Sequence, residues 1–543
     1  MSRTRWSAIA VALAVGCGDG DGGDDVPSGT IDQSPTEPPP SSTICRSTVT
    51  LRAASPVAEA HARKSLPIAI DLGDDGRMRG ARAVKVVLTK DGAAAATILD
   101  TSHDLGTIDA ELDPALTKDL ALGRYSLDAT AGCPAGATSS TPGASQSPLF
   151  LVRLGFTSID VGDGDGARVE LMYHAVDHAY DNVYPISRAI AATLAIPDGA
   201  SELDDDNGAP RAFAKPWDDL DTPPTDAMGA VVETGATLPV SLRVGTKPDL
   251  VFTVAKKGTG LDEQGLPPIR IALGDAPSTD SIAPGAKVTV RLASSPVPAI
   301  ARVDHALAWR FEAKTDSGWV EIPGADASAT LRFYGVLGNA QGTAAPALPW
   351  VAVVDDATRA IAGAASDAAG ARAALVKHVY EDLGLSYDRV NGASHYTDFD
   401  ASFGNATFVL AKFLARENGA VINCSDCASI LSTYANMIGA PLSYAIIEKN
   451  FSLHPILGIG AKEFGSPFDS GRFAFSYHAV TSSDSATTIH DATLAVDGDA
   501  DPSQAPYTEK LATGMPSAEY LQRLSGDPNA HFTHVDQTTK LDF

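Results

Sequence analysis

The most constraining feature of this 543-residue sequence is a change in the period of its apolar residues near position 350. Before that point, short runs alternate between apolar and polar residues, which is typical of half-buried β-strands; examples are Thr48–Ala53, Leu66–Leu72 and Ala83–Thr89. After a Pro- and Ala-rich linker at 344–350, the spacing becomes helical, at Leu375, Val376, Val379 and Leu383. A second apolar helix is expected at Phe408–Arg416. The sequence therefore predicts a multidomain protein in which all-β sandwiches precede an α+β domain.

Residues 45–154 are predicted to form a sandwich of the immunoglobulin-like class. The segment Leu122–Leu127 resembles the entry into a strand at which such domains tie down a corner through a tyrosine hydroxyl, here that of Tyr125. Cys45 and Cys133 bracket the strands, so we expect a disulfide between them, contributing about 4 kcal/mol in the chain-entropy model. Residues 155–345 remain β-rich and fit one or two further sandwiches.

The N-terminus predicts export. Arg3 and Arg5 precede an apolar run that ends before Cys17 and is shorter than the ~20 residues of a membrane-spanning helix, so residues 1–16 are expected to be a signal peptide. Ala14-Val15-Gly16-Cys17 resembles a bacterial lipobox, which implies a lipid on Cys17 and a place in the cell envelope. The pair Gly18-Asp19 after it resembles an outer-membrane sorting signal. Residues 17–44, rich in Gly, Asp, Ser and Pro, are expected to be a disordered tether. A plain signal peptide, with Cys17 removed or unmodified, is the alternative.

The charge balance excludes one class of partner. The formal net charge is −26 and no long basic run is present, whereas nucleic-acid binding requires clustered Lys and Arg. The acidic stretches 160–165 and 203–206 invite a calcium site, but the first lacks the ligand spacing of a calcium loop. Solvated loops are the preferred interpretation of both.

Residues 423–441, NCSDCASILSTYANMIGAP, carry the strongest chemical signal. Apolar residues recur every three or four positions after Cys424, and Gly439 and Pro441 end the pattern, so Cys424 is expected at the start of a helix. The free N–H groups and the dipole of a helix N-terminus stabilise a thiolate, which makes the sulfur a usable nucleophile. A buried structural cysteine is the alternative.

Two later segments supply partners for this thiol. Residues 472–480 are predicted to form a strand that presents His478 among small residues, and a second strand is expected at 487–496. Asp491 on the second strand could then lie across an antiparallel pair from His478 and orient its imidazole. Together Cys424, His478 and Asp491 would form a Cys-His-Asp triad.

These motifs resemble those of the transglutaminase-like branch of the papain-like superfamily. In that family a Cys begins a helix that ends in Gly-Ile-Pro, a His-Ala-Trp strand follows, and then Asp-Pro-Thr; the corresponding positions here are Cys424, Gly439, His478-Ala479 and Asp491-Ala492-Thr493. The resemblance covers about residues 350–505 and leaves 506–543 as a C-terminal extension. It implies that Cys424 is the nucleophile, His478 the general base and acid, and Asp491 the orienting carboxylate, acting on a peptide or protein amide, such as a cell-envelope component. Asn423 and Asn418 are candidate oxyanion donors.

Two other functions remain open at this point. Val480 stands where the family usually has Trp, and inert members of the superfamily exist, so the chain could be a non-catalytic adhesion or scaffold protein. Cys424 and Cys427 also form a C-x-x-C pair, which would permit thiol–disulfide exchange or a disulfide that blocks the nucleophile. No cofactor is implied, and His395, His454, His531 and His534 lack the spacing of zinc ligands.

Overall fold

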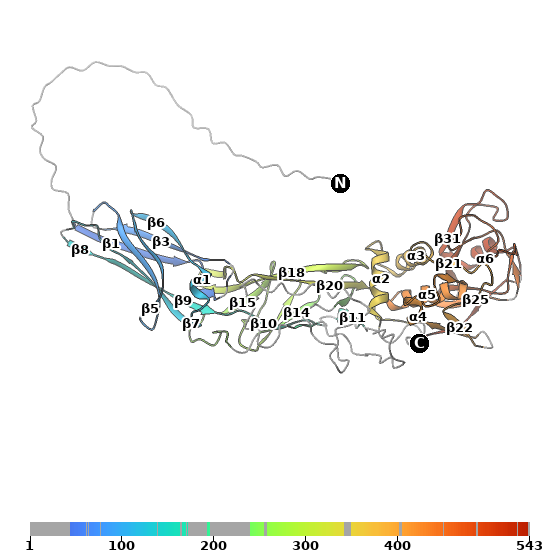
Figure 1. Ribbon diagram of the computed structural model, residues 1–543, viewed down its shortest axis with the longest axis horizontal. Helices are drawn as coiled ribbons and strands as arrows, with labels where there is room; N and C mark the ends of the chain where they lie inside the picture. The colour runs from blue at the N-terminus through green and yellow to red at the C-terminus, as the bar shows by residue number, and fades with distance from the viewer. Residues whose placement is uncertain are drawn as a thin grey trace, which may run out of the picture.

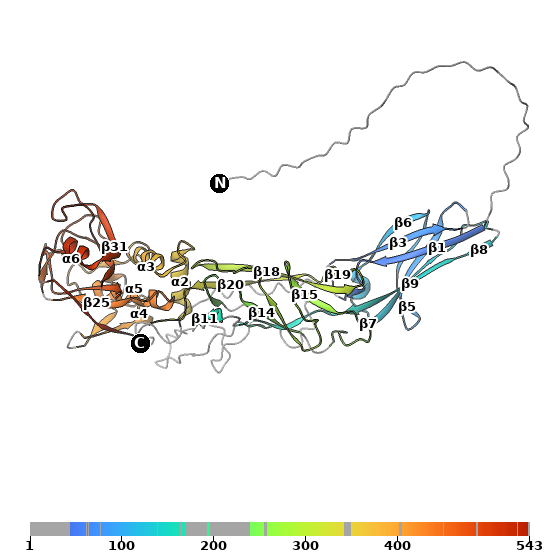
Figure 2. The same cartoon turned by 180° about the vertical axis from the view of Figure 1, so that it is seen from behind.

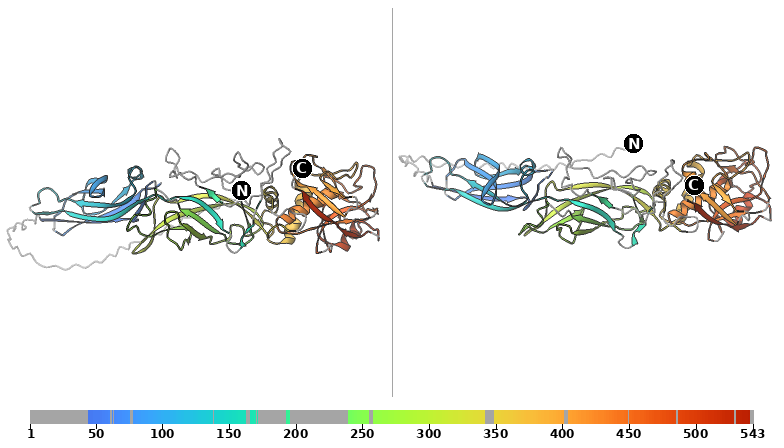
Figure 3. Two further views of the ribbon diagram at one scale, coloured as in Figure 1. Left: turned by 90° about the horizontal axis from the view of Figure 1, so that it is seen from below. Right: turned by 60° about the horizontal axis from the view of Figure 1, so that its bottom comes forward.

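The computed structural model describes residues 44–60, 62, 64–75, 78–137, 139–162, 166–169, 171, 193–195, 239–254, 258–341, 349–400, 404–448, 450–484, 487–528 and 530–540. The molecule is β-rich and elongated, and its three bodies follow one another along the long axis in chain order (Figure 1). The reverse view in Figure 2 and the tilted views in Figure 3 show the same succession. The expected signal peptide, Cys17, the tether up to residue 43 and the acidic stretch 203–206 lie outside the described residues, and Ile44 already belongs to the first strand.

The first body is a sandwich, as predicted. One sheet has the order β6-β3-β1-β8 and the other β2-β9-β7-β4-β5. Alternate residues of β1 are buried, and those of β3 and β4 follow a similar pattern, so each sheet turns an apolar face toward the shared core. The bounds are β1 Ile44–Ala53, β2 Val57–Glu59, β3 Leu66–Asp74, β4 Arg82–Lys90, β5 Ala93–His103, β6 Gly106–Leu112, α1 Pro114–Thr117, β7 Gly123–Ala131, β8 Ser139–Thr141 and β9 Gly143–Val152.

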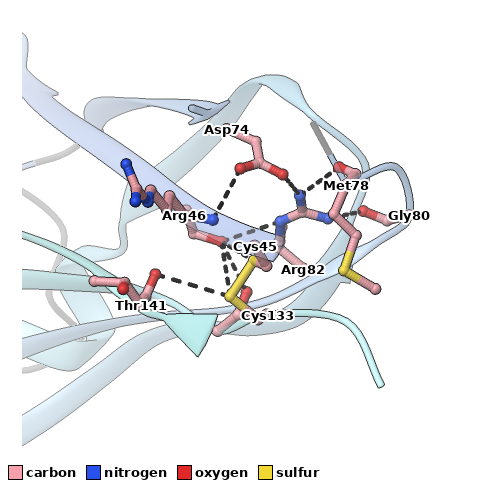
Figure 4. Close-up of a disulfide and its surroundings, with 10 residues drawn as sticks. Cys45, Arg46, Asp74, Met78, Gly80, Arg82, Cys133 and Thr141 are labelled. Atoms are coloured by element: carbon pink, nitrogen blue, oxygen red, sulfur yellow. Dashed lines mark hydrogen bonds and ion pairs between the residues drawn. A yellow bond between two sulfur atoms is a disulfide. The ribbon is translucent and has the colours of Figure 1, made fainter. Parts of the chain in front are cut away.

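Two predicted local features of this body are present. Cys45 of β1 and Cys133, just beyond β7, form a disulfide that ties the two sheets together (Figure 4). The hydroxyl of Tyr125 donates a hydrogen bond to the carbonyl of Ala121 at 2.6 Å, closing the corner before β7. Beside the disulfide, the guanidinium of Arg82 is buried and paired with Asp74, which is an arrangement that the sequence pattern did not indicate.

The described residues of the middle body form two facing sheets around one core. Their orders are β12-β10-β14-β17 and β11-β13-β20-β18-β15-β16, with β19 added on β18. Phe156 contacts Phe252 and Phe311 across this core, with ring centroids 4.8 and 5.4 Å apart. The bounds are β10 Phe156–Gly162, β11 Arg168–Val169, β12 Thr193–Ala195, β13 Val240–Arg243, β14 Asp249–Val254, β15 Ile269–Leu273, β16 Ala276–Pro277, β17 Lys287–Arg291, β18 Arg302–Thr315, β19 Gly318–Glu321 and β20 Ala327–Val336.

The third body mixes helices with strands. Its main sheet has the order β27-β30-β29-β25-β32, with β31 on β30, and a smaller sheet has the order β22-β23-β33. The helical elements are α2 Val351–Ile361, α3 Ala368–Lys377, a π-helical turn His378–Asp382, α4 Leu410–Leu414, α5 Cys424–Met437 and α6 Ser517–Leu524. The strands are β21 Ser386–Tyr387, β22 Thr397–Phe399, β23 Asn405–Val409, β24 Val421–Ile422, β25 Ser443–Ile447, β26 Phe451–Ser452, β27 Leu457–Gly458, β28 Ala474–Phe475, β29 His478–Ser483, β30 Thr488–Asp497, β31 Glu509–Pro516, β32 Phe532–His534 and β33 Asp536–Lys540.

Residues 506–543, expected as an extension, contribute four elements to this third body. β31 pairs with β30, β32 with β25, and β33 with β23. The buried helix α5 contacts β29 and β30, and its Ser432 and Thr433 hydrogen-bond Gln537 and Thr539 of β33. The C-terminal segment is therefore part of the structure that holds α5.

Two predicted elements differ in detail. The strand expected at 472–480 is divided into β28 and β29, because β28 pairs with β26 whereas β29 joins the main sheet beside β25. The helix expected from Phe408 begins at Leu410, because Phe408 lies in β23 and pairs with both β22 and β33. Strand pairing thus decides the local structure at both places.

The joint between the middle and third bodies is closely packed. The N–H of Leu337 donates to the carbonyl of Ile438 at the C-terminal end of α5 (2.9 Å). Gly439 follows with φ 77°, and a Cβ there would lie 2.6 Å from the nitrogen of Gly338. Asp355 of α2 also accepts hydrogen bonds from Arg302 and Tyr334 of the middle body. Within the described residues, no helix has the length and apolar character needed to cross a membrane.

Candidate active site

The helix that begins at Cys424 is started by the residue before it. The side-chain oxygen of Asn423 accepts from the N–H groups of Ser425 and Asp426 at 2.9 and 3.2 Å, and Asp426 accepts from the N–H of Asn423 at 3.3 Å. This reciprocal capping box fixes the first turn of the helix. Cys424 therefore occupies the first helical position, as predicted.

Asp426 also anchors a neighbouring loop. Its carboxylate accepts from the hydroxyl of Ser394 and from the N–H groups of His395 and Tyr396, all at 2.8–2.9 Å. The side chain is fully buried, so these donors replace the water that an ionised carboxylate would otherwise require. The start of α5 and the loop before β22 are thus held as one unit.

The imidazole of His478 is held on two sides. Its Nε2 donates to Oδ2 of Asp491 at 3.0 Å, and the other oxygen of Asp491 accepts from the N–H of Thr493 at 2.7 Å. The ring of Phe475 stacks on the imidazole, with centroids 5.1 Å apart and planes 8° from parallel. The predicted His–Asp pair is therefore formed, from β29 and β30 of the main sheet.

The third predicted partner, Cys424, contributes to the pKa of the His478 imidazole. Nδ1 of His478 is buried and forms no hydrogen bond of ordinary geometry within the described part of the chain. Burial lowers the pKa of His478, but the charge and hydrogen bond of Asp491, with a smaller contribution from Cys424, outweigh burial and raise this pKa to about 10. The three residues thus form one electrostatic unit in which the imidazolium is favoured at neutral pH.

This electrostatic unit predicts a pH dependence. Since the folded-state pKa of His478 is raised above 6.5, protonated His478 contributes stability that is complete below pH 6.5 and is lost as the pH rises through about 10. We expect NMR titration of the imidazole to place its midpoint near pH 10, and Asp491→Asn to move it down toward or below 6.5, because burial then acts with less opposition. The titration of His378, which pairs with Asp356 and Asp382, serves as the internal control. A His478 midpoint that Asp491→Asn leaves in place would contradict the assignment.

The oxyanion candidates have other partners. The amide nitrogen of Asn423 donates to the carbonyl of Gly392 at 3.0 Å, and its oxygen caps α5. The amide nitrogen of Asn418 donates to the carbonyl of His395 at 2.5 Å. Both side chains therefore have a positional role in the resting structure.

Cys427 lies one helical turn after Cys424, and both are free thiols. Cys427 is fully buried, and burial raises the pKa of its thiol, with further contributions from the charges of Asp491, Asp426 and Cys424. A neutral, buried thiol is a poor nucleophile. Of the two cysteines, Cys424 is the one that begins α5 and contributes to the raised pKa of His478.

Four tyrosines surround the triad, and sequence reasoning singled out none of them for this role: Tyr387, Tyr444, Tyr477 and Tyr520. Burial, followed by the charge of Cys424, raises the pKa of Tyr477 to about 12 and also raises the pKa values of Tyr387 and Tyr444. For Tyr520, burial and then the charge and hydrogen bond of Asp491 raise the pKa. Their hydroxyls are therefore protonated at neutral pH. Tyr520 and Leu524, four residues apart, do predict a buried face on a helix, but no spacing connects that helix to Asp491.

The remaining histidines have varied surroundings. Nε2 of His395 lies 3.7 Å from Asp388, and Nε2 of His534 lies 3.2 Å from Asp536. Across the described ranges, no group of three or more His, Cys, Asp or Glu side chains is arranged to hold a metal ion.

No family model and no curated protein matches this chain. Among solved structures, a beta-glucosidase from Listeria innocua aligns at 13% identity and TM-score 0.13, over 19% of this chain and only 16% of its own. Fibronectin(III)-like modules of Clostridium thermocellum CbhA align at 10% identity and TM-score 0.19, over 53% of this chain and 94% of theirs. Three N-terminal domains of the bacteriophage RB49 outer capsid protein Hoc align at 10% identity and TM-score 0.20, over 53% of this chain and 71% of theirs. Scores of this size carry no argument about family or function.

Proposed function

We propose that the third body is a transglutaminase-like domain that catalyses acyl transfer from amide or peptide substrates through Cys424. The observation that carries the proposal is the 3.0 Å hydrogen bond between His478 and Asp491, with the charge of Cys424 acting on the same imidazole. A thiol at a helix N-terminus, an imidazole and an orienting carboxylate are the components of a cysteine-nucleophile triad.

In this mechanism, the thiolate of Cys424 attacks the amide carbonyl carbon and forms a C–S bond. The N–H of Cys424, at the first helical position, stabilises the oxyanion. The C–N bond then breaks, and the imidazolium of His478 gives its proton to the leaving amine, while Asp491 stabilises the charged ring. The thioester is attacked by water, which yields a peptidase or amidase, or by an amine, which yields a cross-linker; His478 accepts the proton of either.

The proposed setting is the bacterial cell envelope, with the chain exported, held at the outer membrane by a lipid on Cys17, and acting on a peptide, protein or cell-envelope amide. The disulfide between Cys45 and Cys133 supports export, because such bonds persist in oxidising compartments. The two sandwiches would then space the catalytic body away from the anchor.

A second candidate is a non-catalytic adhesion or scaffold protein. The observation in its favour is the enclosure of the triad, since Cys424 is 3% exposed and His478 is fully buried. A substrate would require neighbouring side chains to move. The thiol–disulfide alternative draws on the two free thiols, Cys424 and Cys427, in one helical turn.

Alkylation by iodoacetamide separates these functions. An activated Cys424 should react at pH 7 about tenfold faster than a thiol in an unfolded peptide, and His478→Ala should remove that advantage. His490→Ala, which removes another buried histidine of the same sheet, is the matched control and should leave the rate unchanged. Equal alkylation rates of Cys424 in the wild type and in His478→Ala would refute the catalytic proposal and favour the scaffold.

The redox alternative is tested in the same samples. In Cys427→Ala, the alkylation rate of Cys424 should remain at the wild-type level if Cys427 takes no part. Mass spectrometry after exposure to air should then show two free thiols in the wild type. A Cys424–Cys427 disulfide formed under air would instead support thiol–disulfide exchange or a blocked nucleophile.

A further inference from the structure

The hydroxyl of Tyr520 lies at the centre of the His478–Asp491 pair. It donates to Oδ2 of Asp491 at 2.5 Å, and it is 3.2 Å from Nε2 of His478. Tyr520 belongs to α6, far along the chain from all three members of the triad, and its side chain is fully buried. A single carboxylate oxygen therefore accepts from both the imidazole and the phenol.

We propose that Tyr520 is a positioning residue, whose hydroxyl holds the carboxylate of Asp491 in the orientation that binds His478. This inference rests on the proposed function for its catalytic meaning, but the geometry of the His478–Asp491 pair tests it separately. It also makes the C-terminal segment, in which Tyr520 lies, a necessary part of the site.

The physical reason lies in the number of donors that Asp491 receives. Thr493 donates to one oxygen, and His478 and Tyr520 donate to the other, so the charged carboxylate is satisfied without water. Asp491 is 1% exposed, which leaves no solvent to replace a missing donor. Removing the phenol O–H frees the carboxylate to rotate away from the imidazole.

The helix that carries Tyr520 is itself held in place. Arg523 of α6 donates to the backbone carbonyls of Asp497 and Asp499, at the end of β30, at 2.7 and 2.9 Å. Glu519 pairs with Arg523 and with Lys510 of β31, both at 2.8 Å. Because these contacts tie α6 to β30, which carries Asp491, and to the neighbouring β31, the sheet fixes the position of the Tyr520 hydroxyl.

The test compares two tyrosine-to-carboxylate hydrogen bonds. Tyr520→Phe removes the bond to Asp491, while Tyr434→Phe removes the bond from Tyr434 to Asp356 (3.1 Å) on another side of the body. We expect Tyr520→Phe to move the His478 titration midpoint down and to slow Cys424 alkylation at pH 7 by about tenfold, the size of one hydrogen bond to a charged group. Tyr434→Phe should change neither, although it loses a similar bond.

A double-mutant cycle shows whether Tyr520 acts through Asp491. In the Asp491→Asn background, Tyr520→Phe should produce no further change in the His478 midpoint. An unchanged midpoint in the single variant, or a rise, would overturn the proposal; a rise would mean that the phenol only competes with His478 for the carboxylate oxygen.

A measurement on the wild-type chain covers the case in which Tyr520→Phe does not fold. With ¹³C at Cζ of tyrosine, the Tyr520 signal should shift with the titration midpoint of His478. That of Tyr434, which shares Asp356 with His378, should follow the midpoint of His378 instead. A Tyr520 chemical shift that stays constant while His478 titrates would also overturn the proposal. If Cys424 shows no activated alkylation but the midpoint still responds to Tyr520→Phe, the proposed function fails and the positioning role stands.

Discussion

Asp74→Asn is expected to destabilise the first sandwich by about 3–5 kcal/mol, because it leaves the buried guanidinium of Arg82 without its counter-charge. The two side chains are 0% and 1% exposed. Arg82 also donates to the hydroxyl of Ser47 and to the carbonyls of Met78 and Gly80, around the disulfide (Figure 4). These neutral acceptors satisfy N–H groups, but none of them balances the charge.

Hydrogen exchange in β1, β3 and β4 of the full chain measures this loss, because a protein of several bodies need not unfold in one step. Asp100→Asn is the control, since Asp100 lies 3.9 Å from Lys85 and both side chains are more than half exposed. We expect that variant to change stability by less than about 0.5 kcal/mol. Adding Arg82→Met to Asp74→Asn should restore part of the lost stability, because it removes the unpaired charge. Equal hydrogen-exchange rates in Asp74→Asn and Asp100→Asn would contradict the predicted role of the buried ion pair.

Gly439→Ala is expected to destabilise the joint between the middle and third bodies by about 2–4 kcal/mol. Two effects combine there. Gly439 has φ 77°, which costs an L-residue roughly 1–2 kcal/mol, and the added Cβ would lie 2.6 Å from the nitrogen of Gly338. Backbone atoms cannot move aside like a flexible side chain, so the contact from Leu337 to Ile438 must open.

Gly384→Ala separates the two effects. Gly384 has φ 64°, but a Cβ there meets no atom within 4 Å, so only the conformational cost applies. Hydrogen exchange in α5 at increasing urea concentration should show a clearly larger loss of stability of the third body for Gly439→Ala than for Gly384→Ala. Equal losses of stability in the two variants would mean that the backbone at Gly338 moves away from the added Cβ with no loss of free energy.

Much of the fold could be predicted from local pattern. Alternation identified β1, β3 and β4, and helical spacing with a stop at Gly439 identified α5 and its first residue, Cys424. The pairing of Cys45 with Cys133 followed from their places at the ends of one domain. Where pattern misled, at 408–416 and 472–480, a neighbouring strand supplied backbone partners that outweighed local preference.

The site divides in the same way. Cys424, His478 and Asp491 each stand in a motif, so the sequence by itself indicated the residues of the proposed triad. It also determined why α5 begins where it does. Only the tertiary structure brought Tyr520 to Asp491 and Gly338 against Gly439, because both contacts join segments whose separation in the chain carries no periodic signal. These contacts form only when the strands have paired and the helices have packed on the sheet. That packing makes the C-terminal segment, which carries Tyr520, part of the candidate site.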